Sequence, residues 1–179
     1  MYAFPDWRAA PAENVPAALA DWLCETGSLT ERLIASGRLF AVEVLAQGVE
    51  PAWPDEAAAL GLTAGAPALA REVRLTLDGA PFVYARSLCR ADSPAWAGVL
   101  ARGSRSLGLT LFGEPGIARH PLNFCAGLAA QSALLARARA ALPGAGDWLH
   151  ARRSLFGQPD DALLVHEVFH PLLAEVTPS

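Results

Sequence analysis

Residues 68–88 have the sequence ALAREVRLTLDGAPFVYARSL, which predicts a β-hairpin. The pair Asp78-Gly79 is one of the strongest short-range signals for a tight turn between two strands. The odd-numbered positions of the first strand are Leu69, Arg71, Val73, Leu75 and Leu77. Because side chains alternate across a strand, Arg71 is expected on the face that packs against the core.

A second arginine is predicted opposite the first. If Asp78 and Gly79 alone form the loop, the antiparallel register places Arg71 directly across from Arg86. Like charges in opposite positions are unfavourable, and an unpaired buried charge costs far more free energy. Two explanations stay open. Either carboxylates from elsewhere in the chain lie between the arginines, or an anionic ligand does.

The composition favours one domain spanning residues 1–179, with 53% hydrophobic and 18% charged residues. The net charge of −4 argues against a nucleic-acid-binding surface. No apolar run reaches the ~18–20 residues that span a bilayer, and the N-terminus lacks the pattern of a signal peptide. We therefore expect no stable membrane insertion. Three scattered cysteines, an odd number, predict a reduced cytoplasmic protein.

The remaining patterns predict an α+β fold rather than alternating βαβ units. Helices are expected at 15–24, after the capping box formed by Ser28 and Glu31, and over 121–142; strands are expected at 38–49 and 162–173. We expect an antiparallel sheet with helices on one face and an enclosed pocket between the sheet and the helices.

Glu167 is a carboxylate among apolar neighbours in the closing strand, because it shares its face with Leu163, Val165 and Phe169. One interpretation is a purely structural ion pair with Arg71 or Arg86. The other is an anion-binding pocket, in which arginines bind carboxylates and Glu167 acts as a general acid or base. Arg152 and Arg153 are adjacent on a predicted strand, so they face opposite ways, and one of them could line this pocket.

Other candidate sites are weaker. The four histidines lack metal-ligand spacing with the cysteines, so no metal site is predicted. Cys125 and Ser104 lack any nucleophile motif and are interpreted as packing and turn residues.

Five segments resemble the chorismate lyase family in the same order along the chain. They are DWLCETGSLTERLIASG at 21–37, REVRLTLDGAPFVYARS at 71–87, SLGLTLF at 106–112, RRS at 152–154 and LLVHEVFHP at 163–171. Residues 113–150 depart from the family pattern, so the construction of the flaps over the site is not predicted.

The resemblance implies a chorismate pyruvate-lyase, which releases pyruvate from chorismate and leaves 4-hydroxybenzoate for ubiquinone biosynthesis. It implies no cofactor and no metal, chorismate and its two products as the only partners, no nucleic acid, and a monomer. The substrate-binding residues that it implies are Arg71, Arg86, Leu29, Leu107, Gly108 and Glu167. Arg71 would hold the ring carboxylate, and Glu167 would lie at the hydroxyl end and carry a proton. These two are the expected catalytic residues.

A competing hypothesis comes from residues 59–87, which are also similar to the effector-binding domain of GntR-type transcription regulators. Such a domain would bind a small anion without chemistry. Those regulators normally carry an N-terminal winged helix, and we expect none here, so the enzyme is favoured. A catalytically inactive relative that sequesters the ligand stays open, because binding and catalysis would use the same pocket.

Overall fold

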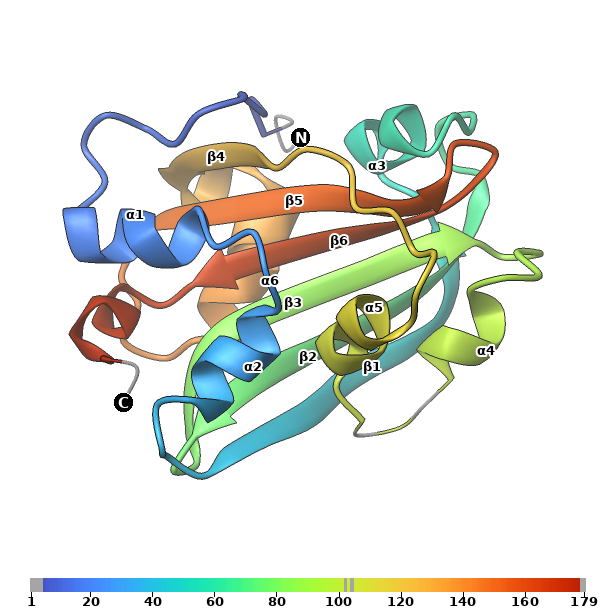
Figure 1. Cartoon of the computed structure of the whole chain (residues 1–179). Coiled ribbons are helices and arrows are strands. Elements are labelled where there is room, and N and C mark those ends of the chain that lie inside the picture. The colour runs from blue at the N-terminus through green and yellow to red at the C-terminus, as the bar shows by residue number, and fades with distance from the viewer. Residues whose placement is uncertain (1–4, 102, 104, 178–179) are drawn as a thin grey trace.

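Six antiparallel strands form one sheet in the order β1-β2-β3-β6-β5-β4 (Figure 1). The computed structural model describes residues 5–101, 103 and 105–177. The strands are β1 (Phe40–Pro51), β2 (Pro67–Leu77), β3 (Ala80–Arg90), β4 (Asn123–Leu128), β5 (Trp148–Gln158) and β6 (Asp161–Phe169). The α-helices are α1 (Ala17–Leu23), α2 (Leu29–Ile34), α3 (Pro54–Ala59), α4 (Ala97–Leu100), α5 (Leu107–Gly113) and α6 (Ala133–Ala141). Two 3₁₀ helices, η1 (Ala129–Gln131) and η2 (Pro171–Glu175), complete the described elements. The predicted α+β class and antiparallel sheet are confirmed.

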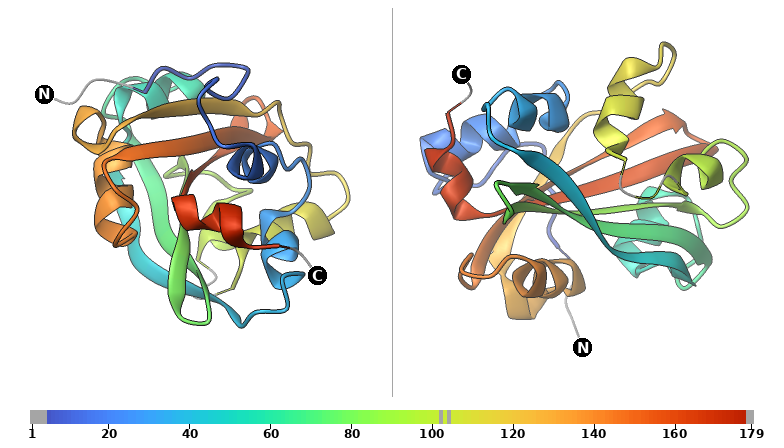
Figure 2. Two further views of the ribbon diagram at one scale, coloured as in Figure 1. Left: turned by 90° about the vertical axis from the view of Figure 1, so that its left-hand side faces the viewer. Right: turned by 90° about the horizontal axis from the view of Figure 1, so that it is seen from below.

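Helices cover both faces of the sheet, whereas we expected them on one face. Figure 2 (right) shows α1, α2, α5 and η2 on one side of the sheet and α6 on the other. The core clusters agree, because Leu33 of α2 packs with Val73 on one face. On the other face, Leu135 of α6 packs with Ala151 and Val168. Both faces of the sheet are therefore buried, and only the first is available to form a pocket beneath α2 and α5.

The β2–β3 hairpin has the predicted turn but a different register. Asp78 and Gly79 both have positive φ, at 51° and 79°, as a two-residue primed turn requires. A bulge follows, because Thr76 pairs with Pro81 while Leu75 already pairs with Val83. Proline has no N–H to donate to the ladder and is found at such irregularities.

The bulge overturns the predicted pairing of the two arginines. Arg71 lies opposite Ser87, and Arg86 lies opposite Glu72. A shift of one residue moves a side chain to the other face of a sheet, so the two arginines point to opposite faces. They do not face each other across one pocket.

The segment 121–142 was predicted to be helical, and only its second half is. Asn123–Leu128 forms the edge strand β4 against β5, and α6 begins at Ala133. Ser132 caps α6, because its hydroxyl accepts a hydrogen bond from the N–H of Leu135 at 3.1 Å. Strand pairing with β5 thus overrides the helix preference of the residues before Ser132.

Candidate active site

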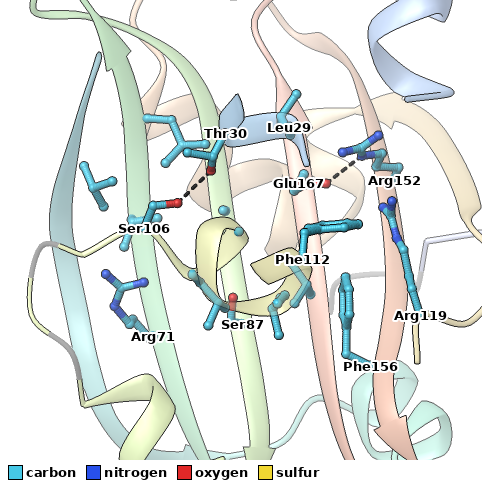
Figure 3. A pocket seen from close by; sticks show the side chains of 18 residues that line it. Leu29, Thr30, Arg71, Ser87, Ser106, Phe112, Arg119, Arg152, Phe156 and Glu167 are labelled. Carbon is cyan, nitrogen blue, oxygen red and sulfur yellow. Dashed lines mark hydrogen bonds and ion pairs between the residues drawn. The ribbon is translucent and has the colours of Figure 1, made fainter. Parts of the chain in front are cut away.

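A pocket lies between one face of the sheet and the helices α2 and α5 (Figure 3). Its walls are largely apolar and include Leu29, Val42, Val73, Leu75, Leu111 and Val165. Its charged lining residues are Arg71, Arg119, Arg152 and Glu167. Apolar walls with a few placed charges are the usual construction of a site for a small polar ligand.

Arg71 of β2 lies at one end of the pocket and is 3% exposed. Its Nη2 atom donates hydrogen bonds to the carbonyl oxygens of Gly103, at 2.6 Å, and Arg105, at 3.2 Å. Its Nε atom is buried without a hydrogen-bond partner, and among the described residues no carboxylate pairs with this side chain. Burial lowers the pKa of Arg71 below its ordinary value. A buried, charged fork without a counter-ion is suited to bind an anion.

Two neighbouring helices close over this end. The hydroxyls of Thr30 in α2 and Ser106, which precedes α5, form a hydrogen bond at 2.7 Å. Ser106 therefore does not cap α5, and Leu107 and Gly108, which also line the pocket, open the helix. The first N–H groups of a helix lack partners within it and can donate to a ligand. A Cβ atom on Gly108 would lie 2.7 Å from Oγ1 of Thr30, so the two helices approach closely only because residue 108 is glycine.

Glu167 of β6 lies on the opposite side of the pocket from Arg71, beside Arg152 of β5 (Figure 3). The two residues pair across the strands, and Nε of Arg152 donates to Oε2 of Glu167 at 2.6 Å. Arg152 also donates through Nη1 to the carbonyl oxygens of Leu23, at 3.0 Å, and Glu25, at 2.7 Å. Arg152 thus fixes the Glu167 carboxylate and holds the end of α1 at the same time.

Arg119 enters the same side of the pocket from the segment before β4. Its backbone bridges to Phe156 of β5, and its side chain lies on the pocket side. The guanidinium donates to the Ser154 hydroxyl at 3.0 Å and to the carbonyl oxygen of Thr26 at 2.8 Å. Burial and the nearby charge of Arg152 lower the pKa of Arg119.

Comparison with known proteins identifies the family. The chorismate lyase family model matches residues 6–176, nearly the whole chain. The chain belongs to the chorismate lyase family. A relative named "Probable chorismate pyruvate-lyase" from Aromatoleum aromaticum is 48% identical over 176 residues, covering 94% of this chain and 93% of the relative. A second relative with that name, from Ralstonia nicotianae, is 42% identical and covers 96% of this chain and 92% of its own.

Solved structures with the same fold include PhnF from Mycobacterium smegmatis. The effector domain of PhnF from Mycobacterium smegmatis is 26% identical, with a TM-score of 0.58, covering 82% of this chain and 90% of that domain. The longer PhnF chain has a TM-score of 0.59 at 24% identity, and the match covers 65% of its length. The chain therefore shares its fold with an effector domain.

The structure brings together five of the six residues that the family resemblance suggested. Arg71, Leu29, Leu107, Gly108 and Glu167 all line the pocket. The partner of Glu167 is Arg152, rather than either arginine of the hairpin. The expectation that one of the two adjacent arginines on β5 could line the pocket is met by Arg152.

Arg86 is the exception and lies on the other face of the sheet in a buried ion cluster. It is 0% exposed, and Nε and Nη2 donate to the two carboxylate oxygens of Glu56 at 2.7 and 3.1 Å. Nη1 donates to Glu72 at 2.8 Å and also pairs with Glu50. Burial alone would lower the pKa of Arg86, but these carboxylates raise it above its ordinary value. Its predicted substrate contact is wrong, because the bulge beside Pro81 turns Arg86 away from the pocket.

Three residues that line the pocket were not predicted from the sequence: Arg119, Phe112 and Phe156. The alternation of β5 could have indicated Phe156, which lies on the same face as Arg152. No periodic signal marks Arg119, since it lies in an irregular segment between α5 and β4.

Cys125 is not among the described residues that line the pocket. Burial raises the pKa of Cys125 to about 12, so its thiol stays protonated at neutral pH, and Ser104 lies outside the described residues. Within residues 5–101, 103 and 105–177, no group of three His, Cys, Asp or Glu side chains could hold a metal ion. No helix in that part of the chain is long and apolar enough to cross a membrane.

Proposed function

We propose that the chain eliminates pyruvate from chorismate and leaves 4-hydroxybenzoate. The charge of the pocket is the main support for this proposal. Among the described residues, those with charged side chains that line the pocket are three arginines and one glutamate, whose formal charges sum to +2. Chorismate carries two carboxylates, so its charge complements the pocket.

Arg71 is proposed to bind the ring carboxylate. Its Nε atom lacks a partner, and the guanidinium fork can engage both oxygens of a carboxylate. The first N–H groups of α5, at Leu107 and Gly108, lie in the same pocket and can add hydrogen bonds. The apolar walls exclude water, which strengthens these charge-assisted contacts.

Glu167 is proposed to act at the hydroxyl end of the ring. Arg71 pairs with Ser87, which pairs with Val165, and Glu167 lies two residues further along β6. The two side chains thus start two strand spacings apart, about 10 Å across the sheet. A ring with polar groups at opposite ends can reach both of them.

The reaction requires proton movement and orientation. The C–O bond between the ring and the enolpyruvyl group breaks, and the neighbouring ring carbon that carries the hydroxyl loses a proton. The ring becomes aromatic, and the leaving enol gains a proton and becomes pyruvate. The atoms balance without oxidant or reductant. Glu167, held by Arg152 at 2.6 Å, is the proposed proton carrier. We further propose, from the family, that the product serves ubiquinone biosynthesis in the cytoplasm.

The test is incubation of the purified chain with chorismate, followed by assay of pyruvate and 4-hydroxybenzoate in the same sample. Equimolar release of both products is the expected result. If 4-hydroxybenzoate binds but neither product forms, the chain is a sensor or a sequestering relative, and the proposed activity is wrong. If no ligand binds, the likeness to the family extends to the fold alone.

A further inference from the structure

We infer that Arg119 is the second anion site of the pocket, and that it binds the carboxylate of the enolpyruvyl group. This inference rests on the proposed function, because it names the group that distinguishes the substrate from the aromatic product. Arg71 would hold the carboxylate that substrate and product share, and Arg119 the one that leaves.

The partners of the three pocket arginines support this assignment. Arg152 is 1% exposed and already pairs with Glu167, so its charge is compensated within the protein. Arg119 donates only to neutral oxygens, and among the described residues no carboxylate forms an ion pair with it. Hydrogen bonds to neutral acceptors orient a guanidinium without neutralising its charge. An anionic ligand would supply the missing charge.

The hydrogen bonds of Arg119 also leave donors for a ligand. Those formed with the described residues use Nε and Nη1, so Nη2 has no partner among them. The Cζ atom lies 5.4 Å from the centre of the Phe112 ring and 5.5 Å from that of Phe156. These two rings and the neutral acceptors fix the plane of the guanidinium, which lowers the entropic cost of binding a carboxylate.

The position of Arg119 matches the chemistry of the substrate. Arg119 lies on the same side of the pocket as Glu167, away from Arg71 (Figure 3). In chorismate, the enolpyruvyl ether is attached to the ring carbon next to the one that bears the hydroxyl. If the hydroxyl points to Glu167, the second carboxylate lies on this side too. After elimination, 4-hydroxybenzoate retains only the carboxylate at Arg71.

The test compares substrate and product in the variants Arg119→Gln and Arg119→Lys. We expect Arg119→Gln to lower kcat/KM for chorismate about 10-fold or more, because a charge-assisted hydrogen bond from a half-buried guanidinium is lost. The Kd of 4-hydroxybenzoate should change less than about threefold, because this ligand lacks the second carboxylate. Arg119→Lys keeps the charge but loses the guanidinium fork, so its kcat/KM for chorismate should lie between those of the wild type and Arg119→Gln. It serves as the readout if Arg119→Gln does not fold. Arg71→Gln should weaken the binding of both ligands.

Arg74→Gln is the matched control, because Arg74 lies on β2 with its side chain on the other face of the sheet. If the Arg119 variants lose kcat/KM for chorismate and affinity for 4-hydroxybenzoate by the same factor, Arg119 only shapes the pocket. If neither quantity falls, Arg119 is not an anion site. Either result overturns the inference while wild-type turnover leaves the proposed function intact. If the wild type does not turn over chorismate, the proposed function fails. The same comparison then uses equilibrium binding of chorismate, and it supports or overturns the anion site by the same criterion.

Discussion

Replacing Arg86 by methionine should destabilise the protein without weakening ligand binding, because this arginine belongs to the buried ion cluster behind the sheet. Arg86 and Glu56 are both 0% exposed and share two hydrogen bonds, at 2.7 and 3.1 Å. Arg86→Met leaves the Glu56 carboxylate with one hydrogen-bond donor among the described residues, the N–H of Trp53 at 3.0 Å. Removal of one member of a buried ion pair costs about 3–5 kcal/mol of unfolding free energy. The double variant Arg86→Met with Glu56→Gln should recover part of this loss, since the uncompensated charge is then removed.

Urea unfolding of the wild type and the variants measures this loss, and calorimetric titration with 4-hydroxybenzoate measures binding. Arg74→Met is the matched control on the same hairpin. Its side chain is 34% exposed and pairs with Glu43, so its loss should cost at most about 1 kcal/mol. The reasoning is refuted if Arg86→Met is as stable as Arg74→Met but binds 4-hydroxybenzoate markedly less tightly. That result would place Arg86 at the ligand.

Three further predictions concern the pocket and the buried histidine behind it. Glu167→Gln should lower turnover about 100-fold or more and change 4-hydroxybenzoate affinity far less, and a fully active variant would end the proton-carrier role. Gly108→Ala should reduce kcat/KM about 10- to 100-fold, because the new Cβ would lie 2.7 Å from Thr30 Oγ1 and force α2 and α5 apart. Gly113→Ala in the same helix, where a Cβ meets nothing within 4 Å, is its control, and equal effects would contradict the prediction. Burial and the charges of Arg153 and Arg86 hold the pKa of His166 well below its ordinary value, so the folded protein keeps this ring neutral while the unfolded chain protonates near pH 6.5. The unfolding free energy should therefore fall by about 1.4 kcal/mol from pH 7.5 to 5.5 on account of this residue, and an unchanged slope in His166→Gln would refute that.

The local signals of the sequence were the reliable ones. The Asp78-Gly79 turn forms as predicted, and the Ser28 hydroxyl accepts from the N–H of Glu31 at 3.2 Å, as the capping box indicated. Arg71 and Glu167 are isolated charges on otherwise apolar strand faces, and both line the pocket. Alternation along one strand could indicate them because it depends on local geometry alone.

The failures came from relations between distant segments. A single bulge beside Pro81 reversed the face of Arg86, and alternation counted from the turn cannot detect such an insertion. The strand within 121–142 depends on pairing with β5, a partner about 25 residues away that helix propensity ignores. A second anion-binding arginine was expected at Arg86, whereas we infer that it is Arg119. Arg119 lies in an irregular segment, and its bridge to Phe156 and its hydrogen bonds to Ser154 and Thr26 place it at the pocket.

We propose that the pocket beneath α2 and α5 holds a carboxylated ring between Arg71 and Glu167. A crystal structure of the chain with 4-hydroxybenzoate tests this most directly. We expect the carboxylate on the Arg71 guanidinium and the amides at the start of α5, the hydroxyl within hydrogen-bond distance of Glu167, and Arg119 without a contact to the ligand. A ligand bound in the reverse orientation, or against Arg86 on the other face of the sheet, would contradict it.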